Sequence, residues 1–147
     1  MRINREKIKS AKTLKSTLLR LKKQGKRVAF TNGCFDILHS GHVDYLQKAK
    51  KMADVLVVAL NSDTSVKRIK GNRRPINSLK NRLKIIAGLE SVDFVTYFSQ
   101  NTPLEIIKFL RPDILIKGGD WSKHKVIGAD IVESYGGRTR TVDYIKG

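Results

Sequence analysis

Two histidines, His39 and His42, stand three residues apart with Gly41 between them. Imidazole nitrogens can donate hydrogen bonds to phosphate oxygens, and the first turn of a helix adds unpaired N–H groups and the positive end of its dipole. If a helix begins near Ser40 or Gly41, this pattern predicts a phosphate-binding turn. Packing or surface exposure explains most random pairs of histidines. Metal binding is a further alternative, but no third ligand stands nearby, so we predict no metal site built by the protein.

The residues before the histidines predict the strand and turn that such a site needs. An apolar strand at about 27–32 runs into Asn32 and Gly33, where a glycine lets the backbone approach a ligand. The amides of Cys34 and Phe35 could then face a phosphate. Asp36 could bind substrate or metal, but we favour a role in which it holds the loop through backbone amides.

Further elements follow at regular spacing. Apolar residues three and four apart predict an N-terminal helix within 1–25, with a stripe made of Ile8, Ala11, Leu14, Leu18 and Leu21. Strands are predicted at 55–60, 94–98, 113–117 and 138–142, and helices begin near Ser40, near Asn61–Asp63, at Ser78, at Thr102–Pro103 and at Val126. Alternating strands and helices predict an α/β fold, a Rossmann-like, doubly wound, parallel sheet of five strands. We expect one domain, 1–147, with the N-terminal helix packed on it.

Ligands of such sheets collect beyond the carboxyl ends of the strands, beside the point where the strand order reverses. The loop Lys117–Trp121 follows a predicted strand and therefore lies at that edge. Gly118 and Gly119 could admit a ligand, Asp120 could accept from sugar hydroxyls or base edges, and Trp121 could stack on a ring. A plain turn is the alternative for the two glycines.

Composition limits the class of protein. The chain has 30 Lys and Arg against 13 Asp and Glu, a net charge of +17, and no apolar run of membrane-spanning length. Such charge favours polyanions, but no aromatic cluster or familiar motif supports nucleic acid, and the aliphatic first helix is a weak candidate for a membrane surface. We expect neither partner. One cysteine excludes an internal disulfide framework and fits the cytoplasm.

The segment Gly33–His42 resembles the signature of the His-x-Gly-His nucleotidyltransferase superfamily, which includes the cytidylyltransferases. A closer resemblance, to the adenylyltransferase domain of the ADP-heptose synthesis enzymes, rests on blocks in family order from about residue 26: Phe30–Asp36, Asn61–Asp63, Arg74–Asn77, Thr102–Glu105, Arg111–Asp113 and Lys117–Trp121. It implies transfer of AMP from ATP to D-glycero-D-manno-heptose 1-phosphate with release of pyrophosphate, and Mg²⁺ that arrives with ATP.

The resemblance also implies roles for individual residues. His39, His42 and Lys70 are expected to be catalytic, and the expected nucleotide or phosphate ligands are Asn32, Gly33, Cys34, Phe35, Gly41, Arg74 and Arg82. Lys70 resembles a family lysine that precedes a glycine-containing loop, and it belongs to a run, 64–89, that holds eight Lys and Arg and no acid. Asp36, Gly118, Gly119, Asp120 and Trp121 are expected to bind the acceptor or the base.

The sequence differs from the family's usual pattern in two ways, and one alternative activity is also compatible with its motifs. Family members continue past the last strand with a Ser-Thr-Thr segment that helps to hold the nucleotide, whereas this sequence stops at Gly147. Many also carry a sugar-kinase domain upstream, so Met1 and the helix after it suggest a stand-alone transferase, although a domain cut from a longer chain would look similar. Glycerol-3-phosphate cytidylyltransferase is the alternative activity, and a homodimer is one option for the assembly.

Overall fold

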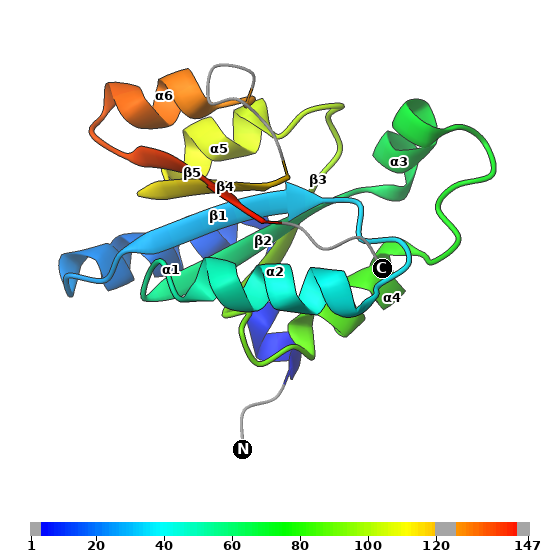
Figure 1. Ribbon diagram of the computed structural model, residues 1–147, viewed down its shortest axis with the longest axis horizontal. Helices are drawn as coiled ribbons and strands as arrows, with labels where there is room; N and C mark the ends of the chain where they lie inside the picture. Colours follow the sequence, from blue (N-terminus) through cyan, green and yellow to red (C-terminus); the bar gives the residue numbers. More distant parts are fainter. Residues whose placement is uncertain (1–3, 120–125, 144–147) are drawn as a thin grey trace.

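The computed structural model describes residues 4–119 and 126–143. They form a five-stranded, all-parallel sheet in the order β3-β2-β1-β4-β5 (Figure 1). Its strands are β1 (Val28–Gly33), β2 (Val55–Asn61), β3 (Phe94–Phe98), β4 (Ile114–Gly118) and β5 (Arg138–Val142). The strand order reverses between β1 and β4, which confirms the predicted doubly wound, Rossmann-like fold.

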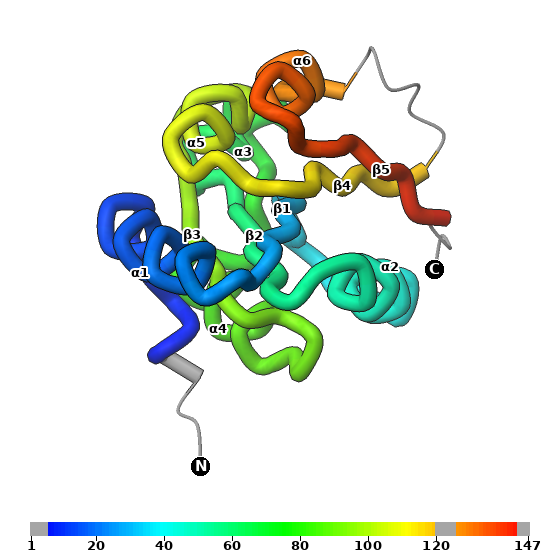
Figure 2. The backbone as a smooth tube through the Cα atoms, turned by 90° about the vertical axis from the view of Figure 1, so that its left-hand side faces the viewer, coloured from blue at the N-terminus to red at the C-terminus, as the bar shows by residue number. Residues whose placement is uncertain are grey.

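Helices cover both faces of the sheet (Figure 2). The helices are α1 (Ala11–Lys23), α2 (Ser40–Lys50), α3 (Asp63–Lys70), α4 (Leu79–Ala87), α5 (Leu104–Leu110) and α6 (Ala129–Ser134), with a short 3-10 helix at Asn4–Lys7. One apolar core joins the sheet to α1, α5 and α6, and a second joins it to α2 and α4. All seven residues of β2 are buried because helices lie on both of its sides.

The sequence positions the helix starts through short polar caps. Ser10, Ser62 and Ser78 each stand before a helix, and each side chain accepts a hydrogen bond from a backbone N–H of the first turn. The end of α3 at Lys70 and the capped start of α4 at Ser78 bound the glycine-containing loop that follows Lys70.

The N-terminal segment differs from the prediction. Ile8 is not part of the apolar stripe of α1, because Ser10 caps the helix two residues later. Instead Ile8 makes a parallel bridge with Val95 of β3, and the N–H of Lys9 donates to the Val95 carbonyl at 3.0 Å. Ile8 packs against the α2–α4 core, whereas Leu14 and Leu18 of α1 pack on the opposite face. The segment therefore passes the free edge of β3, where backbone pairing overrides the helical period.

The last helix is also shorter than predicted. We expected it to begin at Val126, but α6 begins at Ala129, after Gly128 adopts a left-handed backbone with φ of +92°. A Cβ at Gly128 would lie 2.8 Å from the Ile107 side chain, so both conformation and space require glycine.

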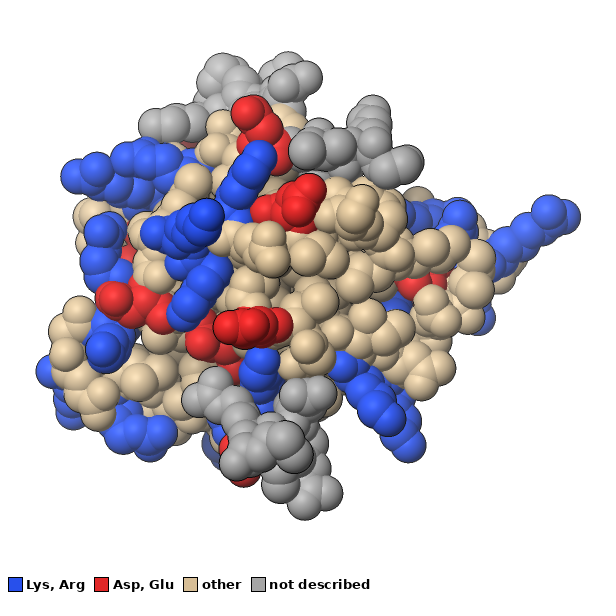
Figure 3. Space-filling view, turned by 60° about the horizontal axis from the view of Figure 1, so that its bottom comes forward, with Lys and Arg blue, Asp and Glu red and all other residues tan. Residues whose placement is uncertain are grey.

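Positive and negative side chains both occur on the face shown in Figure 3. Lys and Arg lie mainly toward the edges of the face shown in Figure 3, with Asp and Glu between them. This face thus offers no continuous cationic surface of the kind that nucleic acids select. Within the described residues, no helix has the length and apolarity needed to span a membrane.

Candidate active site

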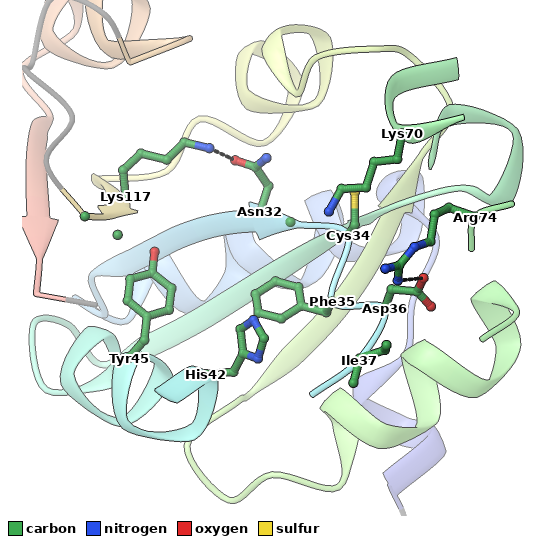
Figure 4. A pocket seen from close by; sticks show the side chains of 13 residues that line it. Asn32, Cys34, Phe35, Asp36, Ile37, His42, Tyr45, Lys70, Arg74 and Lys117 are labelled. Atoms are coloured by element: carbon green, nitrogen blue, oxygen red, sulfur yellow. Dashed lines mark hydrogen bonds and ion pairs between the residues drawn. The ribbon is translucent and has the colours of Figure 1, made fainter. Parts of the chain in front are cut away.

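A cavity of about 910 Å³ opens at the carboxyl ends of β1 and β4. The two strands share the register pairs Ala29–Ile114 and Phe30–Leu115, and no further pair joins them in the part of the chain described here. The split beyond these pairs creates the crevice expected at a reversal of strand order. Its walls are drawn in Figure 4 and consist of Asn32, Gly33, Cys34, Phe35, Asp36, Ile37, His42, Tyr45, Lys70, Arg74, Lys117, Gly118 and Gly119.

The two histidines build the first turn of α2. Nδ1 of His39 accepts from the N–H of Gly41, and Nδ1 of His42 accepts from the N–H of His39, each at 3.1 Å. An Nδ1 that accepts carries no proton, so each neutral ring carries its proton on Nε2. The ring centroids lie 4.0 Å apart. Burial lowers the pKa of His42, with smaller contributions from His39 and Lys70. His42 lines the cavity as a neutral donor, with His39 beside it.

The turn after β1 depends on glycine for packing. A Cβ at Gly33 would lie 2.7 Å from the ring of Phe35. The backbone of Phe35 has a φ of +46°. The same ring contacts His42 edge-on, with centroids 5.3 Å apart. Gly33 therefore admits the Phe35 ring that supports His42. Burial raises the pKa of the neighbouring Cys34 thiol, although the charges of Lys70 and Arg82 oppose that rise.

Asp36 holds the loop between α3 and α4. The carboxylate is 6% exposed and accepts from the backbone N–H groups of Ile76 and Asn77, each at 2.8 Å, and from the guanidinium of Arg74 at 3.1 Å. Burial alone would raise the pKa of Asp36, but these hydrogen bonds together outweigh it and lower the pKa. The loop-holding role that we favoured for Asp36 agrees with this geometry. Arg74 lines the cavity while it pairs with Asp36.

Arg82 differs from the phosphate ligand that we predicted. Its side chain is fully buried, and its guanidinium donates at 2.7–2.9 Å to the Asp63 carboxylate and to the carbonyls of Cys34, Asn61 and Asn77. These acceptors belong to three segments around the site, namely the turn after β1, the junction of β2 with α3, and the loop before α4. The guanidinium therefore ties the segments together instead of lining the cavity, because four hydrogen bonds hold it within the protein.

Lys70 and the two glycines at the end of β4, Gly118 and Gly119, line the cavity. Lys70 is the last residue of α3, is exposed and reaches into the cavity above Cys34 (Figure 4). Gly41 is buried in the first turn of α2. Gly118 and Gly119 line the cavity, whereas Asp120 and Trp121 lie outside the described residues.

Sequence reasoning placed Lys117 at the ligand-binding edge without giving it a role, and it missed Tyr45 as part of the cavity wall. Nζ of Lys117 donates to Oδ1 of Asn32 at 2.5 Å, and burial lowers the pKa of Lys117 to about 8. The hydroxyl of Tyr45 lies 2.6 Å from Oγ1 of Thr31 and donates to the Ile116 carbonyl at 3.3 Å. The signal for Lys117 was its place near the carboxyl end of a predicted strand. Tyr45 stands one helical turn after His42 and so shares its face.

Among the described residues, no group of three His, Cys, Asp or Glu side chains could hold a metal ion. The polar groups of the cavity are mainly donors, namely Nε2–H of His42, the ammonium groups of Lys70 and Lys117, and the Arg74 guanidinium. Such a wall suits anionic ligands, and the helix N-terminus beside it favours phosphate.

A doubly wound parallel sheet with a donor-lined cavity at its switch point defines a nucleotide-binding α/β protein. Residues 30–146 match the cytidylyltransferase-like family model, and the chain belongs to this family. Its Rossmann-like fold agrees with this membership.

Individual proteins with similar sequences include the bifunctional proteins HldE of several bacteria. The bifunctional protein HldE of Hahella chejuensis is 53% identical over 132 residues, which are 90% of this chain and 28% of that protein. HldE of Geobacter sulfurreducens is 49% identical over 141 residues, 96% of this chain and 29% of that protein. The chain thus spans less than a third of the length of these relatives.

Solved structures agree with the fold. The lipopolysaccharide core biosynthesis protein of Thermoplasma volcanium is 30% identical with a TM-score of 0.65, covering 83% of this chain and 98% of that one. Pantoate-beta-alanine ligase of Francisella tularensis, complexed with beta-gamma ATP and beta-alanine, has a TM-score of 0.67 at 16% identity, covering 95% of this chain and 67% of that one. This second likeness concerns the fold alone.

Proposed function

We propose that this chain joins AMP from ATP to D-glycero-D-manno-heptose 1-phosphate, giving ADP-heptose and pyrophosphate for lipopolysaccharide or another surface glycan. The observation that carries the proposal is His42 in the first turn of α2, which lines the same cavity as Lys70 at the switch point and has the ring of His39 beside it. Similarity to HldE at about half identity over most of the chain supports the heptose acceptor. We further propose that the reaction takes place in the cytoplasm.

The proposed reaction does not require a side chain of the protein to form a covalent bond with the substrate. An oxygen of the sugar phosphate bonds to the α-phosphorus of ATP while the bond from that phosphorus to the pyrophosphate oxygen breaks. The attacking oxygen is already an anion, so no general base is needed. Catalysis then consists of alignment and charge neutralisation. Nε2–H of each histidine and the Lys70 ammonium would donate to oxygens of the triphosphate, and the first turn of α2 would add backbone N–H groups.

Magnesium would enter bound to the phosphates of ATP, where it neutralises charge on the departing pyrophosphate. The described residues agree with magnesium that is carried in by ATP, because the cavity supplies hydrogen-bond donors for phosphate but few oxygen ligands for a cation. Asp36, the carboxylate in its wall, is occupied by Ile76, Asn77 and Arg74. We expect excess EDTA to abolish turnover and added Mg²⁺ to restore it, while the urea unfolding midpoint stays unchanged.

The activity is tested by incubating the protein with ATP or CTP and with heptose 1-phosphate or glycerol 3-phosphate, then measuring pyrophosphate. We expect release with ATP and heptose 1-phosphate. Release restricted to CTP and glycerol 3-phosphate would replace the proposal by the cytidylyltransferase alternative. If no substrate pair releases pyrophosphate and the protein binds RNA with an affinity that falls steeply with salt, the result would instead support a nucleic-acid-binding protein.

Lys70→Met should impair the handling of ATP. Losing a hydrogen bond from a charged group costs about 1.5–3 kcal/mol, or roughly tenfold to a hundredfold in kcat/KM for ATP. Steady-state kinetics with ATP varied would measure this loss. Lys67→Met is the matched control, since Lys67 is an exposed lysine one turn earlier in α3. Equal kinetics in the two variants would remove Lys70 from the phosphate site.

A further inference from the structure

Lys117 is half-buried, and none of the described residues forms an ion pair with its ammonium. It lies near the end of β4, and its ammonium donates to the neutral amide of Asn32 at 2.5 Å. The ion pairs found in the described part of the chain use other cations, and none of them includes Lys117. An ammonium withdrawn from water without an anion is costly, so such a group points to a ligand that supplies the negative charge.

The position of Lys117 relates it to the other donors of the cavity. Leu115 packs in the α1–α5–α6 core, so Lys117, two residues on, projects from that same face of the sheet, whereas His42 and Tyr45 come from α2 on the opposite face. Figure 4 shows Lys117 and Lys70 reaching from opposite sides toward the end of β1, where Asn32 and Cys34 stand between them. A phosphate above this strand end would meet one lysine on each side.

We propose that Lys117 binds the phosphate group of the acceptor, and that Asn32 holds the ammonium in place before the acceptor arrives. The proposal rests on the proposed function. In-line displacement places the entering oxygen opposite the departing pyrophosphate. If His42 and Lys70 serve the nucleotide's phosphates, the acceptor enters from the Lys117 side. The acceptor's phosphomonoester supplies the missing anion, its oxygen bonds to the α-phosphorus as pyrophosphate leaves, and Lys117 keeps its proton throughout.

The surroundings of Lys117 strengthen this assignment. Burial lowers the pKa of Lys117 to about 8, which still leaves the group mostly protonated at neutral pH. The same burial reduces screening by water, so an approaching dianion is attracted more strongly than at the surface. Gly118 and Gly119 follow directly and line the cavity without side chains that would block the approach.

The test is Lys117→Met, which keeps the length of the side chain and removes its charge. We expect the KM for heptose 1-phosphate to rise at least about tenfold, by the loss of one charged hydrogen bond, and the KM for ATP to stay within about twofold. Lys48→Met, an exposed lysine of α2, is the control. An increase confined to ATP, or no change in either KM, would overturn the assignment.

A binding measurement separates this proposal from the proposed function. Calorimetry with heptose 1-phosphate or glycerol 3-phosphate, in the absence of ATP, should show binding to the wild type that weakens at least about tenfold in Lys117→Met. If no substrate pair releases pyrophosphate, the proposed function fails, but this comparison still tests Lys117. Equal affinity in both proteins would refute the role of Lys117 in phosphate binding.

A second variant, Asn32→Asp, tests the proposal in case Lys117→Met does not fold. Asn32→Asp keeps the lysine but gives it a carboxylate partner, which should compete with the acceptor's phosphate and weaken its binding to a similar degree. Lys117→Met removes a half-buried charge that has no ion-pair partner among residues 4–119 and 126–143, so its urea unfolding midpoint should equal or exceed that of the wild type. Unchanged acceptor affinity in Asn32→Asp would contradict the proposal.

Discussion

His42→Ala should lower kcat at least about a hundredfold while the sheet remains folded, because loss of one donor to a developing charge costs about 2.7–4 kcal/mol. His42 lines the cavity, and its Nδ1 is engaged by the backbone N–H of His39. The proton on Nε2 is thus the part of the ring that a phosphate oxygen can use. Pyrophosphate release under saturating substrates measures the loss, and far-UV circular dichroism reports the fold.

His39 needs a different substitution, since it also caps α2. Its Nδ1 accepts from the N–H of Gly41, so His39→Ala would remove a cap worth about 1 kcal/mol together with the ring. Asparagine is a good cap but has no group that matches Nε2–H of the imidazole. We therefore expect His39→Asn to retain the unfolding free energy and still lose turnover. Near-normal turnover in both His39→Asn and His42→Ala would exclude the pair from catalysis.

The fold was predictable because its determinants are local. The run 55–60 is apolar at every position, which predicts a strand covered on both faces, and β2 is buried throughout. Ser62 and Ser78 mark the starts of α3 and α4 through caps that need only neighbouring residues. The same reasoning failed for Ile8. Ile8 stands three residues before Ala11, which is a helical spacing, but pairing with Val95, far along the chain, decides its conformation.

The site was predictable only in part, for the same reason. The histidine pair could be recognised because its spacing and its glycine act within one helical turn. In contrast, the residue type of a lysine or arginine does not reveal whether its side chain faces water, a ligand or a protein carbonyl. Arg82 and Lys70 stand in one basic run, yet the first is fully buried and the second is exposed. The acceptors of Arg82 include the carbonyls of Cys34 and Asn61, 48 and 21 residues earlier in the chain, and the fold brings them to its guanidinium.

Arg82→Met should cost about 3–5 kcal/mol of unfolding free energy, the usual penalty for breaking a buried charged network from one side. The substitution leaves three carbonyls, those of Cys34, Asn61 and Asn77, without the donor that now joins them. Urea unfolding at equilibrium measures the change. Lys84→Met, at an exposed position of α4, should stay within about 0.5 kcal/mol of the wild type.

The guanidinium itself, and not only its charge, should be required at position 82. Lysine offers one ammonium group in place of a planar fork, so Arg82→Lys can keep the Asp63 pair or some of the carbonyls, but not all four acceptors. We expect an intermediate loss of stability and reduced turnover at a temperature where the variant is folded, because the segments that present Cys34 and the Asp36-held loop are no longer tied to α4. Full stability in Arg82→Met would show that the cavity wall is held by packing alone.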